Sequence, residues 1–192
     1  MENKKPILSI LIPTIEGRET FYNRLQDELI RQITKYNLID KIQILNSKDK
    51  KGEHSIGWKR NLLLQNCEGE YFMFIDDDDM VCDDALPLII NLLGNNPDVI
   101  TLDGTLTTDG KDPKKFIHSL AYNEWFEKGG VYYRPPNHLN PMKSAIGKQF
   151  KFPDISHGED KDWSMQICKS GLLKTEFSIG KTYYFYDYRT SK

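Results

Sequence analysis

Residues 69–79 read GEYFMFIDDDD, and this stretch decides how the rest of the chain is interpreted. Its apolar part, Tyr71 to Ile75, is short and rich in aromatic residues, which is typical of a buried strand. Four aspartates, Asp76 to Asp79, follow directly. Adjacent carboxylates repel one another and are stable only where a cation or solvent offsets their charge. Because ligands bind at the carboxyl ends of the strands in an α/β sheet, the pattern indicates a strand that places a cluster of negative charge at the ligand-binding edge.

Short apolar runs and helical spacings alternate on both sides of this strand. The predicted strands are 7–12, 42–45, 71–75 and 99–102, and the predicted helices are 19–36, 57–67 and 83–94. This βαβαβαβ order favours an α/β fold with a mainly parallel sheet and helices on both faces, because parallel strands need crossover connections.

The pattern weakens after residue 104, where Gly, Pro and aromatic residues are common. Here the sequence predicts short strands near 116–118 and 131–134, a helix at about 158–170, and two final strands at 173–178 and 182–187. We find no internal repeat, low-complexity tract or linker in the sequence, so we expect one domain over residues 1–192.

The composition excludes several classes of protein. With 39% apolar and 28% charged residues, the chain can build a core, unlike disordered sequences. Its 26 basic against 28 acidic residues argue against general nucleic-acid binding. No apolar run approaches the roughly 18 to 20 residues of a membrane span. The start, MENKKPILSILIPT, lacks a signal-peptide cleavage site, so we expect a cytoplasmic protein.

The four aspartates form a candidate cation site. If the backbone stays extended, Asp76 and Asp78 share one face, and Asp77 and Asp79 share the other. Magnesium and manganese take oxygen ligands, typically one or two carboxylates together with substrate phosphates. The alternative is a solvated acidic loop that caps the next helix, whose N-terminus favours negative charge.

The longer segment GWKRNLLLQNCEGEYFMFIDDDD resembles the family 2 glycosyltransferase pattern, in which a helix with an Arg-Asn pair leads into a strand that ends in a DxD-type motif. ILIPTIEGR near the start and GEDKDWSMQICKSG near the end extend the resemblance over about residues 7–172. It implies a GT-A fold with a Rossmann-like sheet, and sugar transfer from a nucleoside diphosphate sugar to an acceptor hydroxyl. On this basis, residues 1–103 would bind the nucleotide, and residues 104–192 would supply the acceptor and catalytic part.

The resemblance implies roles for the acidic cluster and its neighbours. Asp76 would contact the ribose or a metal-bound water, with Asp77 beside it in the nucleotide site. Asp78 would coordinate Mn²⁺ or Mg²⁺, which offsets charge on the departing diphosphate. Arg60 would lie in the nucleotide pocket, where its planar fork suits phosphate. The alternative for Arg60 is a surface position on an amphipathic helix.

Two loops resemble the family's nucleotide site. Pro13 and Thr14 match its first loop, in which Thr14 would touch the base or ribose. Glu16 stands where the family often has an aromatic residue, and Arg18 is either a phosphate ligand or a solvent-exposed arginine. Asn46 follows the second strand, where many members read uracil with an aspartate. Its amide could pair with a base edge or form a turn, so a UDP-sugar is expected but another nucleoside stays open.

The second acidic motif is HGEDKDW at 157–163. Acids are common in a first helical turn, but together with the aspartate cluster this one resembles the family's ED motif. Asp160 would be the general base, and Glu159 would orient the acceptor or the neighbouring loop. One base and no covalent intermediate imply inversion at the anomeric carbon. His138 is a candidate for the sugar or acceptor site, or else a packed loop histidine.

Two other functions stay open. Asp77, Asp79 and Val81 match the DxDxV pattern of haloacid-dehalogenase-like phosphatases, although that motif normally follows the first strand and here follows the third. The chain could also be a non-catalytic nucleotide-sugar-binding module in which Asp160 only caps its helix. If it is a transferase, we expect a glycan as acceptor.

Overall fold

The first half of the chain alternates strands and helices in the predicted order. In the computed structural model, which describes residues 5–189, its elements are β1 (Leu8–Ile15), α1 (Glu19–Lys35), β2 (Ile42–Asp49), α2 (Ile56–Asn66), β3 (Tyr71–Phe74), β4 (Met80–Val81) and α3 (Ala85–Leu93). Strand β1 lies between β2 and β3 and is parallel to both. The sequence therefore predicted this half correctly, apart from the short β4.

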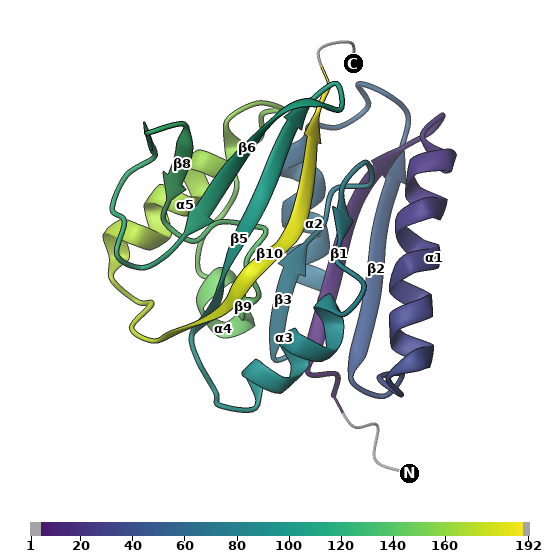
Figure 1. Cartoon of the computed structure of the whole chain (residues 1–192). Coiled ribbons are helices and arrows are strands. Elements are labelled where there is room, and N and C mark those ends of the chain that lie inside the picture. Colours follow the sequence, from purple (N-terminus) through teal and green to yellow (C-terminus); the bar gives the residue numbers. More distant parts are fainter. Residues whose placement is uncertain (1–4, 190–192) are drawn as a thin grey trace.

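Strand β1 shows why the sheet is covered on both faces. Leu8, Ile10 and Ile12 belong to the core cluster that contains the buried side chains of α1 and α3. Leu11 points the other way, into the cluster built with α2 and α5 (Glu159–Ser170). Figure 1 shows α3 in front of the sheet and α2 behind it. Because successive strand residues face opposite sides, an uninterrupted apolar strand needs a helical layer on each face.

The second half extends the same sheet with antiparallel pairs. Its remaining elements are β5 (Val99–Thr108), β6 (Lys111–His118), β7 (Phe126–Lys128), β8 (Val131–Arg134), β9 (Met142–Lys143), α4 (Ser144–Gly147) and β10 (Glu176–Tyr188). The strand order is β2-β1-β3-β9-β5-β6-β8-β7, and β10 pairs with β4 and β5. Figure 1 shows β10 running beside β5 across the middle of the molecule. The mixed sheet with helices on both faces confirms the α/β class.

Three details differ from the sequence prediction. The two predicted final strands are one strand, β10, whose register shifts between Ser178 and Thr182, where Gly180 has φ +73°. The short β9 lies between β3 and β5 and is antiparallel to both. Strand β1 continues through Pro13, because β3 pairs with β1 only as far as Leu11 and leaves one edge open beyond it. Within residues 5–189, the structure contains no helix of the length and apolarity needed to cross a membrane.

Candidate active site

A cavity of about 700 Å³ opens beyond the carboxyl ends of β1 and β3. It is lined by the end of β1, the aspartate cluster, the start of α5, Arg134 and residues 137–139. Parallel strands of an α/β sheet present ligands at this edge. The two acidic motifs of the sequence, more than seventy residues apart along the chain, therefore face one space.

The aspartate cluster is a turn, not an extended segment. The backbone N–H of Asp79 donates to the carbonyl oxygen of Asp76 at 3.0 Å, and β4 starts at Met80. The extended backbone on which alternation of the side chains depended is therefore not present. Arg18 instead bridges two successive carboxylates, with its Nη2 2.9 Å from Asp77 Oδ1 and 2.5 Å from Asp78 Oδ2. The turn lets Asp77 and Asp78 share a single cation.

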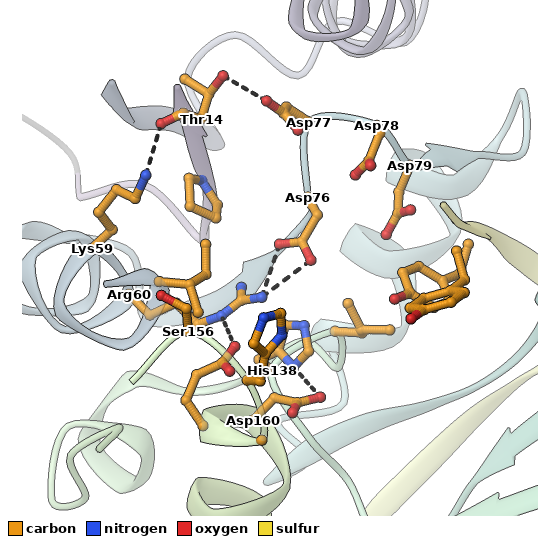
Figure 2. A pocket seen from close by; sticks show the side chains of 18 of the residues that line it. Thr14, Lys59, Arg60, Asp76, Asp77, Asp78, Asp79, His138, Ser156 and Asp160 are labelled. Atoms are coloured by element: carbon orange, nitrogen blue, oxygen red, sulfur yellow. Dashed lines mark hydrogen bonds and ion pairs between the residues drawn. The ribbon is translucent and has the colours of Figure 1, made fainter. Parts of the chain in front are cut away.

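Asp77 connects this turn to the end of β1. The Thr14 hydroxyl donates to Asp77 Oδ2 at 2.6 Å, as Figure 2 shows. Burial raises the pKa of Asp77 to about 6, although the Thr14 hydrogen bond and the charge of Arg18 oppose the shift. Asp77 is thus held in the cavity wall by one hydroxyl and one guanidinium.

Asp79 holds the last strand against the turn. The Tyr184 hydroxyl donates to Asp79 Oδ2 at 2.7 Å, and the backbone N–H of Asp187 reaches Oδ1 at 3.4 Å. The Asp79 side chain is buried, and burial raises its pKa well above the usual range. Both oxygens face β10, so the contacts of Asp79 are those of a structural residue.

Arg60 joins the two acidic motifs. Its Nη2 lies 3.0 Å from Asp76 Oδ1, and its Nε lies 3.3 Å from Glu159 Oε1. The guanidinium is buried and sits over the ring of Phe74, 5.2 Å from the centroid. The alternative of an exposed surface arginine is therefore wrong. Burial raises the pKa of Glu159, while the charge of Arg60 opposes that shift.

Asp160 faces the cavity beside a buried histidine. Its Oδ2 lies 3.8 Å from His138 Nδ1, and about a quarter of the Asp160 side chain (24%) remains exposed. His138 is buried, and burial, followed by the charge of Arg60, holds its pKa well below 6.5. Figure 2 shows this pair on the side of the cavity opposite Thr14. Asp160 is therefore a partly exposed carboxyl group in the first turn of α5.

Lys59 is a cavity residue that the sequence interpretation did not include. Its ammonium group is buried and donates to the backbone oxygen of Thr14 at 3.1 Å and to Asp49 Oδ1 at 2.7 Å. The sequence spacing could have indicated that Lys59 points inward, because Lys59 and the buried Leu63 are four residues apart and so share one face of α2. His54, which lies 3.2 Å from Asp49 and stacks on Trp58, lines the same end of the cavity.

The structure does not bring every candidate to the cavity. Pro13 and Arg18 line it, whereas Glu16 is exposed outside it. Asn46 also lies outside, and its amide donates to the Tyr22 hydroxyl at 3.0 Å. Asn61, the partner of Arg60 in the sequence motif, pairs through its amide with the backbone of Phe152. Asn61 thus fixes a loop and does not contact the cavity.

The carboxylates at this site suit a hard divalent cation that is bound partly by the protein and partly by the phosphates of a substrate. Within the described chain, no group of three or more His, Cys, Asp or Glu side chains is arranged to hold a metal ion. Asp77 and Asp78 nevertheless present adjacent carboxylates at the cavity. Magnesium and manganese often bind one or two carboxylates and complete their shell with phosphate oxygens and water. The residues fit that mode and not an all-protein metal centre.

Comparison with known proteins agrees with this geometry. The fold resembles that of S. aureus TarS 1-349, with a TM-score of 0.66 and 17% identity over 94% of this chain and 60% of that chain. The complex of TarS 1-349 with UDP-GlcNAc matches with a TM-score of 0.66 and 15% identity, covering 96% and 59% of the two chains. These likenesses establish a GT-A fold, and this chain spans about three fifths of that TarS chain. No curated protein matches it in sequence. The family model described as glycosyl transferase family 2 matches residues 20–160, which is most of the chain, and the chain belongs to that family.

Proposed function

We propose that this chain is a metal-dependent, inverting glycosyltransferase that moves a sugar from a UDP-sugar to a hydroxyl group of a glycan. The observation that carries the proposal is that one cavity contains both the Asp77 and Asp78 carboxylates and the Asp160 carboxylate. The chemistry needs these two features together, one at the leaving group and one at the nucleophile. The structures of TarS with UDP and with UDP-GlcNAc support the choice of donor class.

The donor occupies the half of the cavity built by about residues 1–103. Thr14 and Lys59 lie at the nucleoside end, and Arg18 lies beside the position of the diphosphate. Asp78 would hold Mn²⁺ or Mg²⁺, and Asp76, which is paired with Arg60, would contact the ribose or a water on the ion. When bound, the ion acts as a Lewis acid that withdraws charge from the diphosphate leaving group.

The acceptor enters from the half built by residues after 103. Asp160 accepts the proton of the attacking hydroxyl, which is a poor nucleophile without a base. Arg60 holds Glu159 and thereby fixes the first turn of α5, which keeps Asp160 aimed into the cavity. Attack from the side opposite the diphosphate inverts the anomeric carbon.

The contacts of Asp79 argue against the phosphatase alternative. In that mechanism the second aspartate of DxDxV is a general acid that exchanges a proton with the substrate. Here both Asp79 oxygens accept hydrogen bonds from β10, and the side chain is 1% exposed. The position of Asp160 also argues against a role restricted to capping, because its carboxylate faces the cavity.

A thermal-shift screen of nucleoside diphosphate sugars, with and without Mn²⁺, tests the proposal. A ligand that binds only the folded state at about 100 times its Kd stabilises it by about 2.7 kcal/mol. We expect a UDP-sugar to raise Tm in the presence of Mn²⁺ and to have a much smaller effect in its absence. Asp78→Asn should abolish the part of the shift that depends on Mn²⁺. A chain whose Tm responds to no donor under either condition would contradict the proposal.

A further inference from the structure

The acceptor half of the cavity contains an arginine that forms no ion pair with the described part of the chain. Arg134 ends β8 and lines the cavity. Its guanidinium carbon lies 4.2 Å from the ring centroid of Trp125 and 5.5 Å from that of Tyr132. Across residues 5–189, no carboxylate oxygen lies within the 4.0 Å of an ion pair with the Arg134 guanidinium. The aromatic rings therefore position a positive charge that no ion pair within residues 5–189 balances.

Two more donors on this side lack partners. Trp125 Nε1 and Asn137 Nδ2 are both buried, and neither makes a hydrogen bond to the described part of the chain. Asn137 Oδ1 accepts from the backbone N–H of Leu139, which identifies Nδ2 as the unused donor. A buried donor without a partner costs about 1–3 kcal/mol. Trp125 and Asn137 line the same cavity as Arg134, so an oxygen-rich ligand would offset this cost.

The position of Arg134 relative to Asp160 identifies the substrate that it would meet. Arg134 and Asp160 line the same cavity, and no ion pair within 4.0 Å joins them. The charge of Asp160 still opposes the lowering of the Arg134 pKa by burial. Asp160 is the base in the proposed function, and a group beside it contacts the acceptor and not the nucleoside. A guanidinium presents a planar fork that matches phosphate and carboxylate oxygens.

We propose that Arg134, held on the face of Trp125, binds an anionic oxygen group, a phosphate or a carboxylate, carried by the acceptor next to the hydroxyl that Asp160 deprotonates. The inference rests on the proposed function and narrows its acceptor to an anionic glycan. Arg134 is then a specificity-determining residue. Trp125 orients its guanidinium and, together with Asn137, donates to the same anion.

The indole N–H signal of Trp125 provides a direct test. Protein labelled with ¹⁵N is saturated with UDP and Mg²⁺, so that the diphosphate position is filled, and is then titrated separately with inorganic phosphate, acetate and neutral glycerol. Trp125→Phe assigns the signal. We expect phosphate or acetate to shift it with a saturable dependence, and we expect glycerol to leave it in place.

Two variants and one control connect the shift to Arg134. Arg134→Gln should weaken anion binding at least about tenfold, because a charge-assisted bidentate contact is lost. Arg134→Lys, which keeps the charge without the fork, should lie between Arg134→Gln and the wild type. Lys128→Gln removes an exposed positive charge from the neighbouring β7 and should bind the anion as the wild type does.

The outcomes separate this inference from the proposed function. If UDP and Mg²⁺ bind but neither anion moves the Trp125 signal, the inference is overturned and the proposed function stands. If Arg134→Gln binds the anion as tightly as the wild type does, the inference is likewise overturned and the proposed function stands. If UDP does not bind to the wild type in the presence of Mg²⁺, the proposed function fails, and the inference fails with it.

Discussion

Arg18 and Asp78 form an ion pair in which Nη2 of the arginine lies 2.5 Å from Oδ2 of the aspartate. The same nitrogen contacts Asp77, so one guanidinium balances two carboxylates that are almost completely buried. Of these two residues, Asp78 is the one that the proposed function assigns to the divalent cation. Arg18 and the cation therefore compete for the Asp78 carboxylate in the absence of a nucleotide.

This competition predicts a gain of metal affinity in Arg18→Gln. Without the guanidinium, Mn²⁺ should bind the nucleotide-free protein roughly fivefold more tightly, which corresponds to about 1 kcal/mol. The metal-free variant should also unfold more easily, by about 1–3 kcal/mol, because two buried carboxylates lose their counter-ion. Calorimetric titration with Mn²⁺ and urea unfolding measure the two effects. Arg31→Gln removes an exposed arginine from α1, the helix that Arg18 precedes, and serves as control. Weaker Mn²⁺ binding in Arg18→Gln would show that the two cations do not compete.

Arg60 should be a main electrostatic support of the site. Arg60→Met keeps most of the side-chain volume but leaves the Asp76 and Glu159 carboxylates without their buried partner. We expect the free energy of unfolding at pH 7 to fall by about 3–5 kcal/mol. Adding Glu159→Gln to Arg60→Met should recover part of the loss, because one of the stranded charges is removed. Urea unfolding of the wild type, both single variants and the double variant measures this coupling, and simple additivity would contradict it.

Because His118 is buried, we expect the folded protein to lose stability in mild acid. Its Nδ1 lies 2.8 Å from Asn140 Oδ1, and burial lowers its pKa from 6.5 to about 3. Between about pH 3 and pH 6.5, His118 binds a proton in the unfolded chain but not in the folded chain. The contribution of His118 to the free energy of unfolding is therefore fully present above pH 6.5 and is lost as the pH falls. The loss approaches about 1.4 kcal/mol per pH unit.

The matching variant is His118→Gln, which cannot titrate. The difference in unfolding free energy between the wild type and this variant should shrink as the pH falls from 7 to 5. Urea unfolding at each pH measures the difference. A difference that stays constant over that range would mean that His118 titrates alike in the folded and unfolded chains.

Local patterns predicted the parts of the fold that depend on short-range order. The four-residue spacing of Leu25, Leu29 and Ile33 identified α1, and the apolar run before Asp76 identified β3. The prediction of two final strands divided β10 wrongly, because a glycine such as Gly180 is typical of a turn. Pairing with β5 keeps the chain extended before and after Gly180. Such pairing joins residues far apart in the chain, and no local pattern records it.

The candidate site divides in the same way. The aspartate cluster and the Glu159–Asp160 motif were recognisable as motifs, and the structure places them around one cavity. The basic side chains that hold these acidic motifs in place, Lys59 and Arg60, were harder to assign. Lys59 pairs with Thr14 and Asp49, and Arg60 pairs with Asp76 and Glu159, so the roles of both cations depend on tertiary contacts. Asn46 shows the opposite error, because it lies at a plausible motif position but its amide points to Tyr22.

The most direct test of the account is the effect of Asp160→Asn on catalysis compared with donor binding. The rate of UDP release is measured with the UDP-sugar that the thermal-shift screen selects, with water as acceptor, and the Kd of that donor is measured in parallel. Asp162→Asn, an exposed acid in the same helical turn, is the control. We predict that Asp160→Asn lowers kcat by about 100-fold or more while the donor Kd changes by less than about twofold, and that Asp162→Asn changes neither. An Asp160→Asn protein that releases UDP at the wild-type rate would contradict the assignment of Asp160 as the general base.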